Sequence, residues 1–368
     1  MIPVNEPHLG ERELEYVTEC VQTGWVSSAG KFITQFEERW AEYCGRKYGV
    51  AVSNGTVALE LAMDVLDLEP GDEVILPTFT IISCAQAITY AGATPVLVDA
   101  DPRTWCMDTT QLERKITDRT RAIMPVHIYG HPVDMDPVMR LAEKYGLAIV
   151  EDAAEAHGAE YRSRRCGSFG LMSCFSFYAN KLVTTGEGGM ILTDDSSIAE
   201  RLRSLRNLCF QPERRFYHEQ LGYNFRITNL QAALGVAQIE RMDEIVQKKR
   251  WIGEEYTRRL GHIRKIQLPV EEEWARSVYW MYGVVLTSDE GMDAVGFAAK
   301  LKSRGIETRP FFLGMHEQPV FRRHGLFRGE TYPVADRIAR QGLYLPSGIG
   351  LTAGQLGSVC DAVSEVLQ

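Results

Sequence analysis

Short apolar segments alternate with helical segments through the first half of the chain, and this alternation constrains the fold more than any other feature. The apolar segments that we predict to be strands lie at residues 48–52, 73–76, 94–98, 122–126 and 147–150. The helices predicted between them lie at residues 57–63, 83–90, 110–115 and 137–145. Strands that alternate with helices in this way form a mostly parallel sheet with helices on both faces. The sequence therefore predicts an α/β domain.

Polar residues are found where the predicted strands end. In open α/β sheets, ligands bind outside the carboxyl ends of the strands. The polar segments that this rule places on the edge are residues 53–56, 78–83, 127–129 and 152–155, together with Lys181. We therefore expect one ligand site at this edge of the sheet.

Lys181 lies in a glycine-bearing connection between two further predicted strands, residues 174–178 and 190–192. Its neighbours are mostly apolar or small, and burial among such residues disfavours the ammonium form of lysine. A neutral amine that is fixed in place is what Schiff-base chemistry with an aldehyde cofactor requires. The alternative interpretation is a lysine whose ammonium group reaches solvent.

The segment Ser53-Asn54-Gly55-Thr56 joins the first strand directly to an amphipathic helix. Backbone N–H groups at the start of a helix are free to bind an anion such as a phosphate group. The segment thus predicts an anion site, with an ordinary strand-to-helix turn as the alternative.

Asp152 follows the apolar strand at residues 147–150, so its carboxylate is expected inside the fold. An unpaired buried charge is costly, and the carboxylate therefore needs a cationic partner. Lys181 is one candidate. Another is the protonated ring nitrogen of pyridoxal phosphate (PLP), whose known protein contacts are a lysine and a charged group at that nitrogen. PLP accounts for the lysine, the aspartate and the anion site together. The sequence lacks the motifs that would favour another chemistry, namely Gly-x-Gly-x-x-Gly after the first strand, Gly-Lys-Ser/Thr, His-Glu-x-x-His and Gly-x-Ser-x-Gly.

Composition excludes several classes of protein. The chain has 368 residues and a net charge of −9, which argues against nucleic acid as the main partner. No apolar run approaches the roughly 20 residues needed to cross a bilayer, and the first residues lack the features of a signal peptide. The eight cysteines never fall at Cys-x-x-Cys spacing, which indicates reduced, structural thiols. We expect a cytoplasmic protein that has no membrane partner and no metal site.

The pattern changes in the last third of the chain. A long helical stretch running to about residue 256 is followed by an aromatic-rich strand at residues 278–286 and by helices at residues 294–304 and 352–367. We predict a large domain over residues 1–245 and a smaller α+β domain over residues 246–368.

Several motifs resemble those of a known family and extend over essentially the whole chain. They lie at residues 54–59, 77–80, 92–96, 151–158, 176–181, 186–189, 222–226 and 305–316. On these motifs the chain is identified as a member of the DegT/DnrJ/EryC1/StrS sugar aminotransferase family. The resemblance implies a fold-type I PLP enzyme, similar in fold to aspartate aminotransferase.

The resemblance also implies roles for individual residues. Lys181 would bond to the cofactor and then act as the catalytic base, and Asp152 would keep the ring nitrogen protonated. Glu155 would lie beside the phenolic oxygen of the cofactor. The phosphate group would be held by Gly55, Thr56, Ser176 and, from the neighbouring subunit, Asn224. Shared active sites of this kind require at least a homodimer.

In this family L-glutamate leaves its amine as pyridoxamine phosphate, and the amine then passes to C-4 of a nucleotide-linked 4-keto-6-deoxysugar. The resemblance favours GDP-4-keto-6-deoxymannose as the acceptor and GDP-perosamine as the product, with UDP- and dTDP-linked sugars as alternatives. It also implies a place in the O-antigen part of lipopolysaccharide biosynthesis. The residues whose positions match substrate contacts of the family are Trp25, Ser27, Arg226, Arg309 and His316.

Two other functions are known or conceivable for a protein with most of these motifs. Family members that dehydrate a ketosugar have histidine in place of the lysine, so Lys181 argues against that activity. A non-catalytic sensor of sugar nucleotides has no need of Asp152, Lys181 and Asn224 together. The sequence departs from the family at Ile81, where an aromatic residue often stacks on the cofactor ring.

Overall fold

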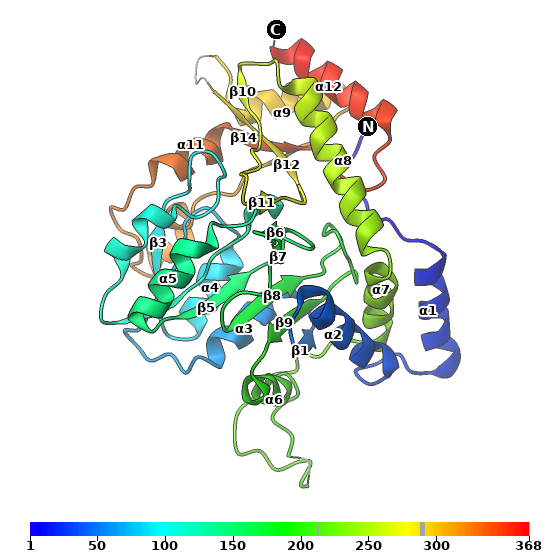
Figure 1. Cartoon of the computed structure of the whole chain (residues 1–368), viewed down its shortest axis with the longest axis vertical. Coiled ribbons are helices and arrows are strands. Elements are labelled where there is room, and N and C mark those ends of the chain that lie inside the picture. Colours follow the sequence, from blue (N-terminus) through cyan, green and yellow to red (C-terminus); the bar gives the residue numbers. More distant parts are fainter. Residues whose placement is uncertain (212, 288–290, 368) are drawn as a thin grey trace.

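The computed structural model describes residues 1–211, 213–287 and 291–367. Its main element is a seven-stranded sheet with the strand order β1-β9-β8-β5-β4-β2-β3 (Figure 1). Strand β9 is antiparallel to β1 and β8, and every other pair of neighbours in this sheet is parallel. The predicted, mostly parallel sheet is confirmed. Its strands are β1 (Tyr48–Val52), β2 (Glu73–Pro77), β3 (Thr94–Val98), β4 (Thr120–Ile123), β5 (Ala148–Asp152), β8 (Met172–Ser176) and β9 (Gly189–Thr193).

Helices cover both faces of this sheet, with α2 and α5 in front of it and α3 and α4 behind it in Figure 1. The residues that these helices turn toward the sheet are apolar, which explains why the strands are buried on both faces. The helices of this part are α1 (Glu11–Thr23), α2 (Lys31–Cys44), α3 (Gly55–Asp64), α4 (Ile82–Tyr90), α5 (Met135–Tyr145), α6 (Ser196–Leu205) and α7 (Asn229–Ile239).

Two predicted helices differ from the structure. The segment expected at residues 110–115 forms two short 3-10 turns, η1 (Thr109–Gln111) and η2 (Glu113–Lys115), the first of which is capped by the side chain of Asp108. The long helical stretch is interrupted at Glu240 and Arg241, so that α7 ends there and α8 (Met242–Leu260) begins. A further short helical turn, η3 (Ile128–Gly130), follows β4.

A second, smaller sheet lies at the top of the molecule in Figure 1 and has the strand order β10-β12-β14-β13, with all neighbours antiparallel. Helices α8, α9 and α12 pack with it around a separate apolar core. The predicted smaller α+β unit is therefore present. Its elements are β10 (Ile266–Gln267), β12 (Tyr282–Leu286), α9 (Ala294–Ser303), β13 (Arg309–Pro310), η4 (Met315–Glu317), α10 (Pro319–Arg323), α11 (Pro333–Gln341), β14 (Gly342–Leu345) and α12 (Ala353–Leu367).

Helix α8 passes from one core to the other. Ile245 and Val246 belong to the core of the large sheet, whereas Ile252 and Tyr256 belong to the core of the small one. The predicted boundary at residue 245 lies within this helix, and the division into residues 1–245 and 246–368 stays a prediction. A short sheet, β6 (Glu160–Tyr161), β7 (Arg164–Arg165) and β11 (Ala275–Arg276), connects the two parts of the chain again.

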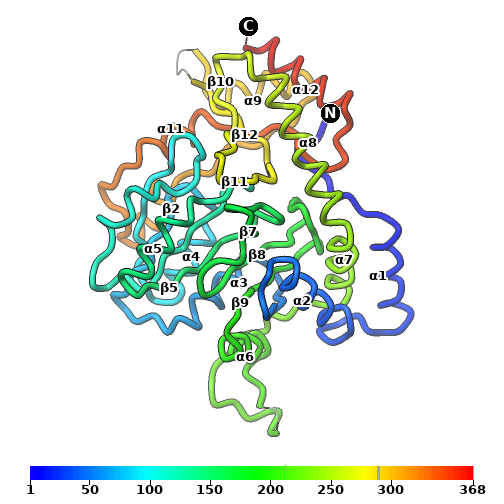
Figure 2. The backbone as a smooth tube through the Cα atoms, in the orientation of Figure 1, coloured from blue at the N-terminus to red at the C-terminus, as the bar shows by residue number. Residues whose placement is uncertain are grey.

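The first residues of the chain and helix α12 both lie beside the small sheet, as the tube in Figure 2 shows. The backbone N–H of Ile2 donates to the carbonyl of Gly305 over 2.7 Å, and Ile2 pairs with Ile306. The first residues are thus anchored to the smaller unit before the chain enters the large one.

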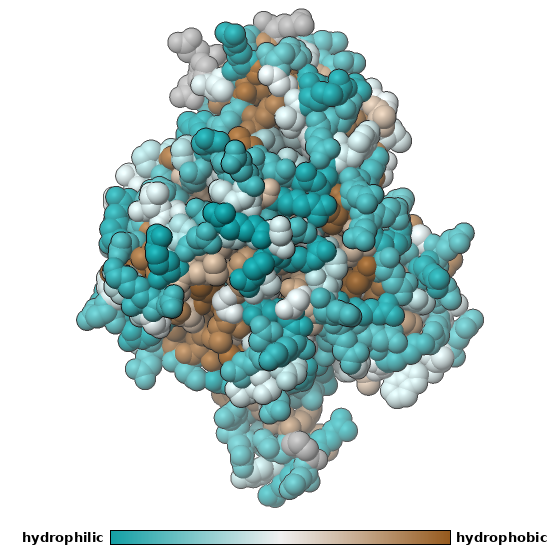
Figure 3. Space-filling model, viewed as in Figure 1, coloured by the Kyte–Doolittle hydropathy of each residue, from teal (hydrophilic) through white to brown (hydrophobic). Residues whose placement is uncertain are grey.

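Hydrophilic residues predominate on the face of the molecule shown in Figure 3. Among the residues described, no helix combines the length and the apolar character needed to span a membrane. All eight cysteines are free and buried, in agreement with the predicted structural thiols.

Candidate active site

The carboxyl ends of β1, β5 and β8 lie at one edge of the large sheet, where they border a cavity of about 570 Å³. The edge forms because these strands run in the same direction, so the residues that follow them converge. Six residues that sequence analysis assigned to the cofactor site line this cavity: Gly55, Thr56, Asp152, Glu155, Ser176 and Lys181.

Lys181 sits in the connection between β8 and β9, and only 10% of its side chain is exposed. Its Nζ atom lies 3.7 Å from Oε1 of Glu155 and 3.7 Å from the centre of the Trp280 indole ring. Burial lowers the pKa of Lys181 below its ordinary value, whereas the charges of Glu155 and Asp152 act in the opposite direction. The amine is thereby held in a site that favours proton loss.

Glu155 lies just after β5 and is equally buried. Burial raises the pKa of Glu155 to about 7, although the positive charge of Lys181 opposes this rise. The backbone N–H of Tyr129 donates to Oε2 of Glu155 over 2.7 Å and fixes the carboxyl group. A carboxyl group with such a pKa can hold or release a proton near neutral pH.

Asp152 ends β5, and its carboxylate accepts hydrogen bonds from the thiol of Cys84 at 2.9 Å and from the backbone N–H of Ala154 at 3.1 Å. Cys84 lies on α4, and burial raises the pKa of this thiol well above its usual value. The thiol therefore stays protonated and acts as a donor, which fits the predicted structural role of Cys84. Within the described ranges, no lysine, arginine or histidine forms an ion pair with Asp152.

The first turn of α3 forms the opposite wall of the cavity. The side chain of Asn54 caps the helix by accepting from the N–H of Val57, and the N–H groups ahead of it have no partner within the helix. Gly55 permits a close approach to β8, because a Cβ atom at this position would lie 2.6 Å from Cβ of Ser176. The hydroxyl groups of Thr56 and Ser83 are 2.8 Å apart beside this turn. Backbone and hydroxyl donors thus surround an anion site.

The cavity also has an aromatic wall that sequence analysis missed. It consists of Trp280, Phe312 and Tyr344, all from the last third of the chain. The sequence did show an aromatic-rich strand at residues 278–286. Such a pattern predicts that the aromatic rings are buried, but it does not predict which cavity the ring of Trp280 lines. Ile81 lines the cavity as well and is 41% exposed. An aliphatic side chain therefore lines the cavity at the position where the family often has an aromatic residue.

Asn224 and Arg226 lie apart from this cavity. Nε of Arg226 donates to Oδ1 of Asn224 over 2.8 Å, and Asn224 is exposed. Arg226 borders a second cavity of about 560 Å³, whose lining includes three more arginines: Arg203, Arg206 and Arg215. Within one chain the structure does not bring Asn224 to Lys181.

Trp25 and Ser27 belong to a loop that is tied to the start of α7. Asn229 donates from its side chain to the carbonyl of Trp25 at 2.7 Å and from its backbone N–H to the carbonyl of Ser27 at 2.6 Å. Trp25 remains 58% exposed. Neither residue is among the described residues that line the Lys181 cavity.

Arg309 lies at the margin of the cavity. It is exposed, forms a 2.6 Å ion pair with Glu307, and faces Tyr344 in the register of β13 and β14. Since Tyr344 lines the cavity, Arg309 is the strand neighbour of a residue of the cavity wall.

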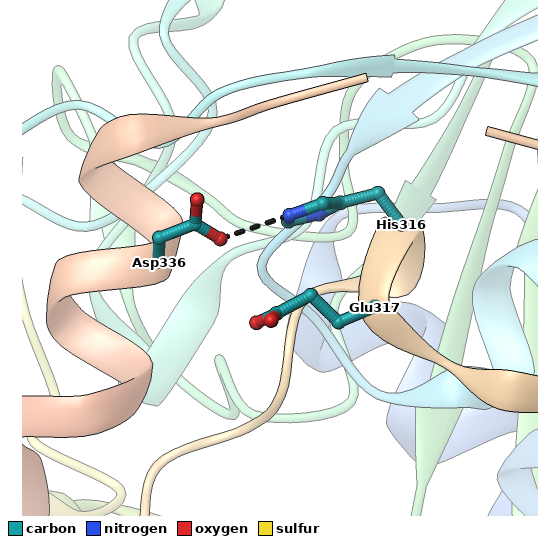
Figure 4. Close-up of side chains that lie close together, drawn as sticks. All are labelled: His316, Glu317 and Asp336. Carbon is teal, nitrogen blue, oxygen red and sulfur yellow. Dashed lines mark hydrogen bonds and ion pairs between the residues drawn. The ribbon is translucent and has the colours of Figure 1, made fainter. Parts of the chain in front are cut away.

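His316 is buried outside the cavity, and both of its ring nitrogens have partners. Nδ1 lies 2.8 Å from the hydroxyl of Thr78, and Nε2 lies 2.9 Å from Oδ1 of Asp336 (Figure 4). Glu317 is close to this pair, and Arg340 forms ion pairs with both carboxylates, at 2.6 Å and 3.8 Å. The arginine supplies the positive charge that these carboxylates need, so the cluster forms an ion-pair network.

The residues of the cavity fit PLP. The Asp152 carboxylate lines the cavity and forms no ion pair with a basic side chain in the described part of the chain. It is therefore available for contact with a cationic ring nitrogen. The α3 N-terminus offers donors to a phosphate group, and Lys181 offers an amine. The buried Oδ1 atom of Asn180, on the cavity wall, has no hydrogen-bond partner among the described residues, which is consistent with a site built for a ligand.

Comparison with known proteins identifies the family. The model of the DegT/DnrJ/EryC1/StrS aminotransferase family matches residues 7–364. The chain belongs to this family. It is 44% identical to the GDP-perosamine synthase of Caulobacter vibrioides, with 100% of this chain and 98% of that protein covered. It is 39% identical to the GDP-perosamine synthase of Escherichia coli O157:H7, with 99% and 98% covered.

Among solved structures, the chain is similar to Spr1654 from Streptococcus pneumoniae, at 26% identity. The PLP form of that protein superposes with a TM-score of 0.92 and 100% of both chains covered. The PMP form gives a TM-score of 0.93, with 100% of this chain and 98% of that chain covered. The predictions of the fold and of a PLP-dependent sugar aminotransferase are confirmed.

Proposed function

We propose that the protein transfers an amino group from L-glutamate to C-4 of GDP-4-keto-6-deoxymannose and so forms GDP-perosamine. Family membership supports the aminotransferase reaction, and the likeness to two GDP-perosamine synthases over their whole length supports this acceptor. The observation that carries the proposal is the meeting of Lys181, Asp152 and the α3 N-terminus in one cavity.

PLP, when bound, supplies an aldehyde carbon that reacts with amines and a ring that withdraws electrons. With PLP bound, Lys181 would move the protons. Its Nζ atom would take the proton from the α-carbon of L-glutamate and pass it to the carbon that carried the aldehyde. In the second half-reaction it would take a proton from that carbon and deliver it to C-4 of the sugar. Burial of the amine favours the neutral form that the first of these transfers requires.

The other residues of the cavity bind and orient. The Asp152 carboxylate would accept a hydrogen bond from the ring nitrogen, and the donors of Cys84 and Ala154 hold that carboxylate in place. Gly55, Thr56 and Ser176 would bind the phosphate group. Glu155 would serve the phenolic oxygen, since its raised pKa lets the carboxyl group share a proton.

Asn224 reaches the phosphate group of a second subunit, so the working unit is a homodimer with shared active sites. Its exposure and its separation from the cavity of its own chain support this arrangement. Trp25, Ser27, Arg226 and Arg309 contact the sugar nucleotide or the glutamate carboxylate in the assembled site. For His316 the bonds of both ring nitrogens favour a role in packing over contact with substrate.

The protein works in the cytoplasm, where free thiols such as its buried cysteines persist. A nucleotide-linked aminosugar is a substrate for sugar transfer, and we assign the product to O-antigen synthesis.

The test of the reaction is the visible spectrum of the purified protein after incubation with PLP. We expect an absorption band that is absent in Lys181→Ala and that L-glutamate removes from the native protein. A native protein without this band would overturn the proposal, and a band that glutamate leaves unchanged would point to another amino donor.

The acceptor is tested separately. GDP-, UDP- and dTDP-linked 4-keto-6-deoxysugars compete in one assay in which the aminosugar product of each is measured separately. We expect the GDP-linked sugar to be used in preference to the others. Preference for a UDP- or dTDP-linked sugar would retain the aminotransferase and replace the substrate.

A further inference from the structure

Lys181 is in contact with an aromatic face. Its Nζ atom lies 3.7 Å from the centre of the Trp280 ring, a distance at which the ring attracts an ammonium group. Trp280 is 4% exposed, so water does not weaken this attraction. Trp280 lies two positions before the first residue of β12, in the last third of the chain.

Trp280 is fixed on several sides. Its indole N–H donates to the carbonyl of Asn180 over 2.8 Å, which ties the ring to the residue just before Lys181. The side chain of Asn5 donates to the same carbonyl over 2.7 Å. On the backbone side, a Cβ atom at Gly130 would lie 2.8 Å from the N atom of Trp280, so the two backbones are in close contact. The ring therefore has little freedom to move away from Lys181.

A second buried lysine holds the backbone of Trp280. Nζ of Lys249, on α8, donates to the carbonyl of Trp280 over 2.8 Å and to the carbonyl of Ser347. Lys249 is 3% exposed and forms no ion pair with a described carboxylate. Burial lowers the pKa of Lys249 to about 7. A lysine is costly to bury in this way. Its two carbonyl partners, on Trp280 and Ser347, come from segments that are far apart in the sequence.

We propose that Trp280 is a positioning residue that holds the amine of Lys181 against its ring whenever that amine is not bonded to another group, and that Lys249 fixes Trp280 for this purpose. The proposal rests on the proposed function, because in transamination the lysine leaves the cofactor and has to return to it in each cycle. A held amine returns from one defined position, whereas a free side chain would search several rotamers.

Other ionisable groups also surround Lys181. The carboxylates of Glu155 and Asp152 stabilise its ammonium form, whereas the nearby thiol of Cys84 stays protonated and neutral. His157 also interacts with Lys181, and burial lowers the pKa of this imidazole to about 3, so it stays neutral. These groups are unchanged when Trp280 alone is replaced, so a comparison among Trp280 variants isolates the ring.

The test uses the full-length protein without cofactor and compares Trp280→Phe with Trp280→Leu. Acetic anhydride acetylates only neutral amines, and mass spectrometry of the Lys181 peptide across a pH series gives the midpoint of the reaction. We expect the midpoint to fall by about one pH unit in Trp280→Leu and by less in Trp280→Phe, since phenylalanine retains an aromatic face. Both variants lose the indole hydrogen bond to Asn180, so the difference between them reports on the aromatic face.

Trp251→Leu is the matched control. Trp251 lies on α8 with Nζ of Lys248 4.0 Å from its ring, and neither residue lines the cavity. We expect this variant to leave the Lys181 midpoint unchanged. Equal midpoints in Trp280→Phe and Trp280→Leu, or a leucine variant equal to wild type, would overturn the role of the ring.

Lys249→Met tests the second part of the proposal, since methionine keeps much of the buried stem and removes the donor. We expect faster hydrogen exchange of the backbone around Trp280 and a downward shift of the Lys181 midpoint. Unchanged exchange and an unchanged midpoint would overturn the role of Lys249. Because acetylation and exchange require no cofactor and no turnover, both readouts stay informative if the proposed sugar reaction fails.

Discussion

Glu155 and Lys181 show how burial sets the protonation of a facing acid and base. Burial acts against the charged form of both groups: it raises the pKa of Glu155 and lowers the pKa of Lys181. Each charge partly opposes the effect of burial on the other, across the 3.7 Å that separates Nζ from Oε1. Glu155 is therefore sensitive to pH near neutrality, and this sensitivity is measurable without substrate.

Glu155 should make stability fall as the pH rises. Its pKa increases from 4.5 to about 7 on folding, so between these values the folded protein binds more protons than the unfolded one. By linkage, stability then decreases with increasing pH across this interval. We expect Glu155→Gln to abolish this decrease, a difference on the order of 3 kcal/mol at the upper end. Urea unfolding of the cofactor-free proteins measures it.

The exposed glutamate Glu200 on α6 provides the control for that experiment. Glu200→Gln should keep the wild-type pH dependence. If wild type and Glu155→Gln lose stability in parallel across the interval, the carboxyl group of Glu155 does not carry the effect.

Among the secondary-structure elements, the contact of α3 with β8 places the anion site. Helix α3 begins at Gly55 directly beside the last residue of β8, Ser176, and no other residue type fits there without displacing one element. The position of the helix N-terminus therefore depends on one missing methyl group.

Gly55→Ala should weaken both the fold and the binding of PLP. The new Cβ atom would lie 2.6 Å from Cβ of Ser176, so α3 or β8 has to shift. We expect a loss of about 1–3 kcal/mol in the free energy of unfolding and PLP binding weakened by about tenfold. Chemical unfolding and equilibrium dialysis with PLP measure the two effects.

Gly354→Ala, on α12, serves as its control because no heavy atom lies within 4 Å of the new Cβ position. This variant should bind PLP as tightly as wild type. Wild-type binding by Gly55→Ala would show that the close contact does not position the anion site.

For the molecule as a whole, the open question is assembly. Asn224 lies outside the cavity that contains Lys181 in its own chain, although the family motifs assign both to one phosphate-bound cofactor. The symmetric dimer that we propose would resolve this separation, because each chain would then complete the site of the other.

Coexpression of Lys181→Ala with Asn224→Ala chains tests the shared site. Random pairing produces hybrid dimers in which one site has both native residues, so we expect about a quarter of the wild-type activity to return. Each variant alone should have far less. Pairing Lys181→Ala with Asp152→Ala is the control, because those residues line the same cavity and no hybrid site is intact. Equal activity in the two mixtures would contradict a shared site.

The sequence by itself determined the large sheet and the polar part of the site. Strands β1 and β3 begin and end as predicted, because strands buried on both faces leave an unbroken apolar run between turn residues. Gly55, Asp152 and Lys181 were predictable for a related reason, since parallel strands bring their carboxyl ends to one edge whatever the details of packing. Family motifs then added the reaction.

Only the tertiary structure decided which distant residues complete that site. Trp280 reaches Lys181 from a segment that follows the whole large sheet, and an aromatic-rich strand pattern contains no information about its partner. Outside the cavity, the ring of His316 likewise contacts the hydroxyl of Thr78, a residue 238 positions away. Contacts of this kind join segments that lie far apart in the chain, and local periodicity does not reveal them. The sequence thus determined the polar residues at the edge of the large sheet, and the tertiary structure decided which aromatic residues form the wall of the cavity there.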